Sequence, residues 1–245
     1  MPMSPELNKI FTVDPFEKMH QDSLGEVCNL LKGKWVKSEK FRKDIPDPLN
    51  GEAFLNVPDT TEYSDYINNL DICPKSGLHN PLKNVERYLM LGKVCAKVAE
   101  ALRNEEVLGY FVKLIQRVMP KSDSQCLGEV KVTRVFFENF SGDNVRFLAR
   151  SFSNPGDHLG QESSGYRWPF GSVCIIAPFN FPLEIPALQV MGALFMGNRP
   201  LVKVDSKVSV VFEQLLRLLI HCGLPAEDVD FINCKGQVMG ELVEK

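Results

Sequence analysis

The chain has 245 residues, of which 44% are hydrophobic, and its 28 basic and 31 acidic residues give a formal net charge of −3. Length and composition are those of an ordinary globular chain with one large domain or two small ones. The two signs of charge are mixed along the sequence, and no stretch is apolar enough to span a bilayer, so we expect neither nucleic acid nor a membrane among its partners.

The N-terminal part of the chain is irregular. Residues 1–32 are predicted to be a loosely ordered leader, because the first 24 are mixed in character and interrupted by prolines. They contain no secretory apolar core, and the acidic Glu6, Asp14 and Glu17 are untypical of a mitochondrial presequence. GKWV (33–36) and DPLNGEAFLNV (47–57) then predict short strands around an Asn-Gly turn.

Three helices and a hairpin are expected next. Apolar residues recur at three- and four-residue steps in 84–103 and in 105–118, which predicts two amphipathic helices. Ser122 and Ser124 are candidate caps for a third helix that runs to about Ala149. Turn residues dominate 150–170, which predicts a β-hairpin.

From Ser172 onward the pattern changes to alternating strands and helices. We predict strand 172–177, helix 183–196, strand 200–204, helix 207–221 and strand 229–232, a βαβαβ order that implies a parallel sheet and an α/β fold. Helix 183–196 is apolar nearly all round and is expected to be buried on both sides. Helix 207–221 is expected to be capped by Ser206 and ended by Gly223 and Pro225.

Parallel sheets bind ligands at the carboxyl ends of their strands. Two segments lie there, APFNFP (177–182) and KVDS (203–206). The dinucleotide signature GxGxxG is absent, so a dinucleotide would have to bind with another geometry. Asn180 is a single polar residue between two phenylalanines, and it is either a helix or turn cap or a hydrogen-bond donor in an active site.

The cysteines and histidines give no sign of a metal site or a disulfide framework. The seven cysteines are scattered without a CxxC pair, and the four histidines have no ligand spacing. We expect Cys174, inside a strand, and Cys222, on the apolar face of a helix, to be packing residues, since reactive thiolates need exposed, electropositive surroundings.

The order of these motifs resembles the aldehyde dehydrogenase superfamily, from about Lys34 to the last residue. The segments GYRWPFG, PFNFPLEIP, MGALFMGN, LVKVDSKVS and CGLPAEDVDFIN are most similar to the plant-type delta-1-pyrroline-5-carboxylate dehydrogenase branch of that family. The resemblance implies an aldehyde dehydrogenase-like fold, represented by its N-terminal portion and truncated before the catalytic domain. After the leader (1–32), it implies a helical part of the cofactor domain (33–149), an oligomerisation-type hairpin (150–170) and a partial Rossmann-like sheet (171–245).

The resemblance also implies roles for single residues. Asn180 matches the catalytic asparagine, whose side-chain amide donates to the aldehyde oxygen as that oxygen becomes an anion. Lys203 matches the lysine that binds the adenosine ribose of the cofactor. Ser206 stands where NAD-preferring members often carry a glutamate, which leaves room for NADP although NAD is favoured. The cofactor cleft is expected to be lined by Ala177, Pro178, Phe179 and Asn180.

The resemblance places the aldehyde tunnel beside the same segment. Its candidate lining residues are Phe181, Glu184 and Leu188. The preceding helix supplies Glu138, Phe140 and Asn144, for which packing or a solvated face is the alternative interpretation.

The implied reaction is NAD-dependent oxidation of L-glutamate 5-semialdehyde to glutamate in proline breakdown, by a mitochondrial homo-oligomer. The cytoplasm is the alternative location, since no presequence is visible. The family's nucleophile and general-base motifs, which resemble GQ-x-C and E-x-G-G, do not occur in these 245 residues, so the chain alone is expected to be inactive. It is then either part of an incomplete gene model or a natural, non-catalytic short form that pairs with full-length subunits through its hairpin.

Overall fold

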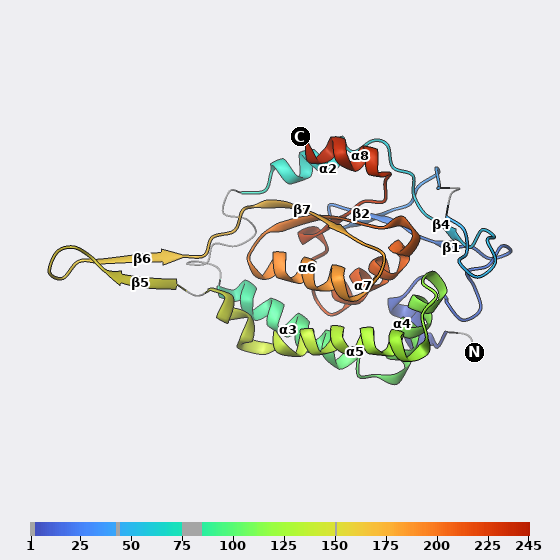
Figure 1. Ribbon diagram of the computed structural model, residues 1–245, viewed down its shortest axis with the longest axis horizontal. Coiled ribbons are helices and arrows are strands. Elements are labelled where there is room, and N and C mark those ends of the chain that lie inside the picture. The colour runs from blue at the N-terminus through green and yellow to red at the C-terminus, as the bar shows by residue number, and fades with distance from the viewer. Residues whose placement is uncertain (1–2, 43–44, 75–84, 150) are drawn as a thin grey trace.

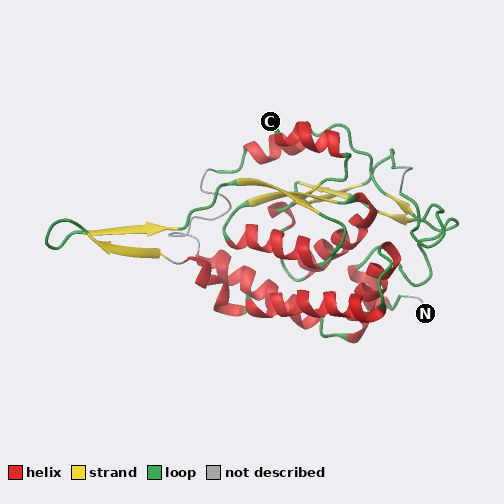
Figure 2. Cartoon of the chain, viewed as in Figure 1, coloured by secondary structure: helices red, strands yellow, loops and turns green. Residues whose placement is uncertain are grey.

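The computed structural model describes residues 3–42, 45–74, 85–149 and 151–245. Their centre is a five-stranded sheet of order β3-β2-β9-β8-β7 (Figure 2). Its parallel part consists of β7 (Ser172–Ala177), β8 (Arg199–Val204) and β9 (Asp230–Phe231). Beyond β9 the sheet continues antiparallel, through β2 (Asn29–Leu31) and β3 (Lys34–Val36). The parallel βαβαβ arrangement is therefore confirmed.

Helices cover the sheet in layers (Figure 1). One face carries α6 (Glu184–Phe195) and α7 (Ser209–His221), preceded by a short 3-10 turn, η2 (Ser206–Val208). An outer layer packs over these two helices and consists of α3 (Val85–Ala101), α4 (Glu105–Val118) and α5 (Asp123–Asn139). The other face carries α2 (Ser64–Asp71) and α8 (Gly236–Val243), which share a smaller apolar cluster. Because α6 lies between the sheet and the outer helices, its apolar residues are buried on both sides, as predicted.

Glycine and aspartate, rather than serine, shape the turns around α6 and α7. Gly197 has a φ of +80° after α6, and Gly223 has a φ of +108° after α7, both in the left-handed region that favours glycine. The prediction that Ser206 caps the helix is wrong. The carboxylate of Asp205 accepts from the Lys207 amide at 2.9 Å instead, because Ser206 already lies inside the short turn η2.

The prediction of a loosely ordered leader over 1–32 does not hold for the described part of that segment. Residues Pro5–Ile10 form α1, which Ser4 caps, and strand β1 (Gly25–Glu26) pairs in parallel with β4 (Leu55–Asn56). Leu7, Phe11 and Met19 are buried in the main core. The ring of Phe11 stacks on Tyr110 of α4 at 4.0 Å. The segment is ordered because its scattered apolar residues find partners on helices far along the chain.

Short strands form in both predicted segments, as β3 (34–36) and β4 (55–56), but they do not form a hairpin around the Asn-Gly turn. Strand β3 pairs with β2 around Lys32 and Gly33, both of which have positive φ. The Asn50-Gly51 turn is flanked by a single bridge between Pro46 and Ala53. The buried Leu30 aligns with Phe231 of β9, so the hairpin extends the central sheet instead of forming a separate one.

The third predicted helix is shorter than expected. Helix α5 ends at Asn139, and residues Gly142–Ala149 form a 3-10 helix, η1. Gly142 has a φ of +59°, and its carbonyl oxygen approaches α3 where Gly92 has no side chain. The break lets η1 fold back along α3.

The hairpin predicted over 150–170 is confirmed. Strands β5 (Ser151–Pro155) and β6 (Glu162–Tyr166) pair antiparallel and project away from the layered body (Figure 1). Almost all of their residues are exposed. No helix in the described ranges is long and apolar enough to cross a bilayer.

Candidate functional site

The two segments singled out from the sequence meet at one edge of the sheet. Strands β7 and β8 are neighbours, with Ile176 opposite Lys203 and Ala177 opposite Val204. The Asp205 amide donates to the Ala177 carbonyl oxygen at 3.1 Å, which ties the two strand ends together. The carboxyl ends of these strands therefore form a single candidate site, at the edge where parallel sheets bind ligands.

A groove of about 390 Å³ opens beside Lys203. Its floor is apolar, and on α8 both Gly236 and Gly240 leave open space, because a Cβ added at either would meet no atom within 4 Å. An apolar floor suits a planar base, and the half-buried Lys203 ammonium can donate to ribose hydroxyls. The groove is therefore the candidate site for the adenosine half of a dinucleotide. Its lining residues are Ile176, Lys203, Gly236, Met239, Gly240, Val243 and Glu244.

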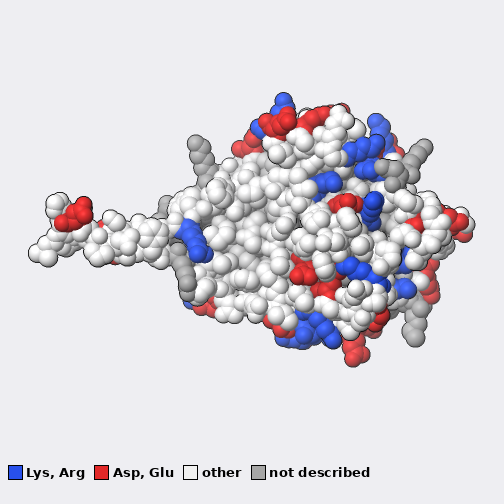
Figure 3. Space-filling view, in the orientation of Figure 1, with Lys and Arg blue, Asp and Glu red and all other residues white. Residues whose placement is uncertain are grey.

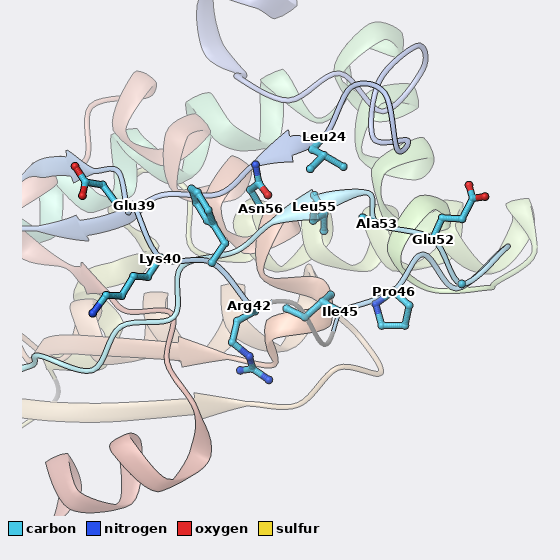
Figure 4. Close-up of a pocket in the computed structure, with 12 residues that line it drawn as sticks. Leu24, Glu39, Lys40, Arg42, Ile45, Pro46, Glu52, Ala53, Leu55 and Asn56 are labelled. Atoms are coloured by element: carbon cyan, nitrogen blue, oxygen red, sulfur yellow. The ribbon is translucent and has the colours of Figure 1, made fainter.

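Ser206 has a partner that the sequence pattern did not reveal. Its hydroxyl is nearly buried and accepts from Arg42 Nη1 at 3.3 Å. Arg42 also lines a cavity of about 590 Å³ in the N-terminal segment, where Leu24, Ile45 and Leu55 provide apolar walls (Figure 4). No local signal could have identified Arg42, since it precedes Ser206 by 164 residues.

The Asn180 side chain is exposed in this structure, although the sequence predicts an apolar, water-poor corner. The flanking rings of Phe179 and Phe181 are 47% and 41% exposed. In the described hydrogen-bond network the Asn180 carboxamide has no partner, so it is available to a ligand. Ala177 before the exposed stretch, and Pro182 and Leu183 after it, are buried. The asparagine therefore does not act as a cap.

The candidate substrate residues that follow Asn180 lie at the N-terminus of α6. The ring of Phe181 faces the Lys121 ammonium, 4.2 Å from the ring centroid. Glu184 is half-buried, and burial together with the nearby charge of Glu129 raises the pKa of its carboxyl group. Leu188 lies half-buried one turn further along the helix.

The candidates on the preceding helix have other partners. Glu138 forms ion pairs with Arg103 at 2.8 Å and with Arg134 at 3.1 Å. The Phe140 ring packs against Phe195, with centroids 4.8 Å apart, and Asn144 is exposed on η1. These contacts favour the alternative interpretation for Glu138 and Phe140.

Five of the seven cysteine thiols do not resemble nucleophiles. Burial raises the pKa of Cys95 to about 12 and those of Cys28, Cys222 and Cys234 to about 11, which keeps these thiols protonated at neutral pH. Burial also raises the pKa of Cys174. The prediction that Cys174 is a packing residue is wrong, however, since it is exposed on the uncovered face of the edge strand β7. None of these five thiols has the lowered pKa of a reactive cysteine.

Comparison with known proteins identifies the family of the chain. The model of the aldehyde dehydrogenase family matches residues 35–245. The chain is 56% identical, over 95% of its length, to a probable aldehyde dehydrogenase of Linum usitatissimum and to the mitochondrial delta-1-pyrroline-5-carboxylate dehydrogenase 12A1 of Arabidopsis thaliana. It spans 42% of the length of each of these relatives.

Solved structures match in fold. A putative methylmalonate-semialdehyde dehydrogenase from Sinorhizobium meliloti 1021, complexed with NAD, superposes with a TM-score of 0.77 at 21% identity, over 92% of this chain and 44% of that one. A 3,6-anhydro-L-galactose dehydrogenase superposes with a TM-score of 0.73 at 22% identity, over 90% of this chain and 45% of that one. Because the family model covers almost the whole chain, the chain belongs to the aldehyde dehydrogenase family.

Proposed function

We propose that this chain is the cofactor-binding and oxyanion-stabilising part of a delta-1-pyrroline-5-carboxylate dehydrogenase, which oxidises L-glutamate 5-semialdehyde to glutamate with NAD. The observation that carries the proposal is the 56% identity over 95% of the chain to the Arabidopsis thaliana enzyme of that name. Two neighbouring features at one sheet edge support it: the Asn180 loop, which is residues 178–183 between β7 and α6, and the Lys203 groove, which is the groove beside Lys203 described above.

In this proposal each residue has one task. The Asn180 carboxamide donates a hydrogen bond to the aldehyde oxygen as that oxygen gains negative charge, and the Lys203 ammonium holds the ribose hydroxyls. The rings of Phe179 and Phe181 shield the reacting carbonyl from water once a ligand covers them. A bound nicotinamide supplies the hydride acceptor. The nucleophile and the general base have no counterpart among the motifs of these 245 residues.

NAD is the proposed cofactor, with NADP as the competitor. A glutamate at position 206 would repel a 2′-phosphate, whereas Ser206 cannot, and the Arg42 guanidinium next to its hydroxyl adds a positive charge. Assays should therefore compare both cofactors. The compartment proposed by analogy with the Arabidopsis thaliana relative is the mitochondrion.

The alternative function is that of a non-catalytic partner, which pairs with full-length subunits through the β5–β6 hairpin. Its exposed residues Phe152, Leu159 and Tyr166 favour this candidate, since apolar side chains on a projecting arm are typical of an interface.

The first experiment is to capture the native protein from its source, with an antibody against residues 80–150, and to determine its intact mass. A mass well above 27.6 kDa, with activity on glutamate semialdehyde and NAD, would support the dehydrogenase. A mass of 27.6 kDa without activity would contradict it, and co-purifying full-length subunits would then identify the partner role.

If the native protein is active, Asn180→Ala is expected to lower kcat by about 10²- to 10³-fold, because the oxyanion loses a preorganised donor. KM for NAD should change little, since Lys203 and the groove remain. Asn139→Ala, at the exposed end of α5, is the matched control and should retain wild-type kinetics. Equal kinetics for both variants would contradict the assigned role of Asn180.

A further inference from the structure

The Asn180 loop is held by two charged residues of the outer helical layer that the sequence pattern did not single out. We propose that Lys121 and Glu129 act as positioning residues, which fix the backbone from the Asn180 carbonyl group to the start of α6 and so restrict the direction of the Asn180 carboxamide. Lys121 lies just before α5, and Glu129 lies within it. Together they span the contact between α5 and α6.

Lys121 holds the loop at Asn180 itself. Its ammonium donates to the Asn180 carbonyl oxygen at 2.5 Å and to Glu129 Oε2 at 2.9 Å, and it lies over the Phe181 ring at 4.2 Å. The Lys121 side chain is only 12% exposed. A largely desolvated ammonium interacts more strongly with a carbonyl dipole and a ring face than an exposed one does. Lys121 thus restrains the peptide that follows Asn180.

Glu129 holds the loop three residues further on. Its Oε1 accepts from the Leu183 amide at 2.8 Å and from the Glu184 amide at 3.3 Å, which are the first free amides of α6. No residue of the loop caps this end, since the N-cap position is Leu183. The fully buried Glu129 carboxylate, from another helix, takes over that role and complements the positive end of the helix dipole.

The two anchors leave little freedom between residues 180 and 183. Both Glu129 carboxylate oxygens accept hydrogen bonds, and the Lys121 ammonium donates to Glu129 and to the Asn180 carbonyl oxygen. Pro182 restricts the backbone further. With the backbone fixed, the exposed Asn180 side chain keeps only its own torsions. The stiffness of the loop follows from these contacts alone. Its use in oxyanion binding rests on the proposed function.

Hydrogen exchange on the 245-residue chain tests the stiffness without any activity. In Lys121→Met, the amides of Leu183 and Glu184 are expected to exchange about 10- to 100-fold faster, the factor for a lost charge-assisted hydrogen bond. Amides of β8 and α4 should keep their rates. The matched control is Lys131→Met on the exposed side of α5, which should leave the loop amides within about twofold of wild type.

Two further variants separate positioning from general support of the fold. Lys121→Arg keeps the charge and the donors, and should restore most of the protection and the wild-type NMR signal of the Asn180 side-chain amide. Glu129→Gln keeps an acceptor for Leu183 but presents a donor group to Lys121, so it should shift that signal as Lys121→Met does. The proposal is overturned if Lys121→Met behaves like Lys131→Met, if it speeds exchange equally in every element, or if Lys121→Arg does not rescue.

Discussion

Single buried polar side chains connect strands of the central sheet to neighbouring segments through hydrogen bonds. The Asn198 Oδ1 atom accepts from the amides of Phe170 and Gly171, at 2.7 and 3.2 Å, and so joins the turn after α6 to the start of β7. Asp230 accepts from the Lys32 amide at 2.9 Å and from Asn69 at 2.5 Å, and so joins β9 to β2 and α2. Each is satisfied by hydrogen bonds, as buried polar groups must be.

Gly92 is a residue whose lack of a side chain allows a backbone contact. The Gly142 carbonyl oxygen occupies the space that a Cβ at Gly92 would need. Gly92→Ala is therefore expected to lower the free energy of unfolding by at least about 2 kcal/mol, because η1 would have to move away from α3. Gly128→Ala in α5 meets no atom within 4 Å and should instead add up to about 1 kcal/mol. Urea denaturation of both variants checks this, and a change of the same sign in both would contradict it.

Among the helices, α7 connects the N-terminal segment to the sheet through a buried ion pair. Glu213 is fully buried, accepts from the Cys28 amide at 2.8 Å, and pairs with Arg217 at 2.7 Å. The Arg217 guanidinium in turn lies over the Trp35 ring at 4.0 Å. The helix thus fixes the β2–β3 hairpin as the antiparallel end of the central sheet.

This buried carboxyl group makes stability depend on pH. Burial raises the pKa of Glu213 from 4.5 to about 7, so the folded chain binds this proton more tightly than the unfolded chain does. The resulting stabilisation is complete below about pH 4.5 and is lost as the pH rises to about 7. Between pH 5 and 8 we expect the free energy of unfolding of the wild type to fall by about 2–3 kcal/mol more than that of Glu213→Gln. Parallel pH curves from urea denaturation would contradict this.

Across the molecule, one part of the surface is apolar and lacks a cover. In the view of Figure 3, charged side chains lie at the periphery and over the middle and right of the body, while the left part, next to the projecting hairpin, is largely uncharged. Strand β7 is an edge of the sheet, and Ile176, Phe179 and Phe181 near its end are all more than 40% exposed. Edge strands and apolar patches of this kind favour association with another chain.

We expect the β5–β6 hairpin to contribute to association but not to folding, because its strands add nothing to the buried core. Replacing residues 151–166 by a short Gly-Ser linker should leave the melting temperature within about 2 °C of wild type, since surface changes cost little. We expect the sedimentation coefficient of the wild type to rise with concentration, and the deletion to abolish that rise. Phe152→Ser is the milder companion variant and should weaken association partially. Unchanged sedimentation after the deletion would contradict this role.

Much of the secondary structure and part of the site are encoded locally. Apolar periodicity, capping residues and glycine stops predict α4, α6, α7 and β7 to within about two residues, since these signals lie inside each element. The parallel order of the strands then brings Asn180 and Lys203 to one sheet edge without further information. The loop that presents the amide and the strand that ends at the groove were therefore foreseeable.

The remaining features depend on partners far apart in the chain. Packing of Phe11 on Tyr110, the approach of Arg42 to Ser206 and the contact of Lys121 with Asn180 join residues separated by 59 to 164 positions. Neither a local hydrophobic period nor a capping residue predicts such a contact, because the contact forms only when the folded layers bring the two surfaces together. The order of the N-terminal segment, the exposure of Cys174 and the anchoring of the Asn180 loop thus emerge only when the helices and the sheet are assembled.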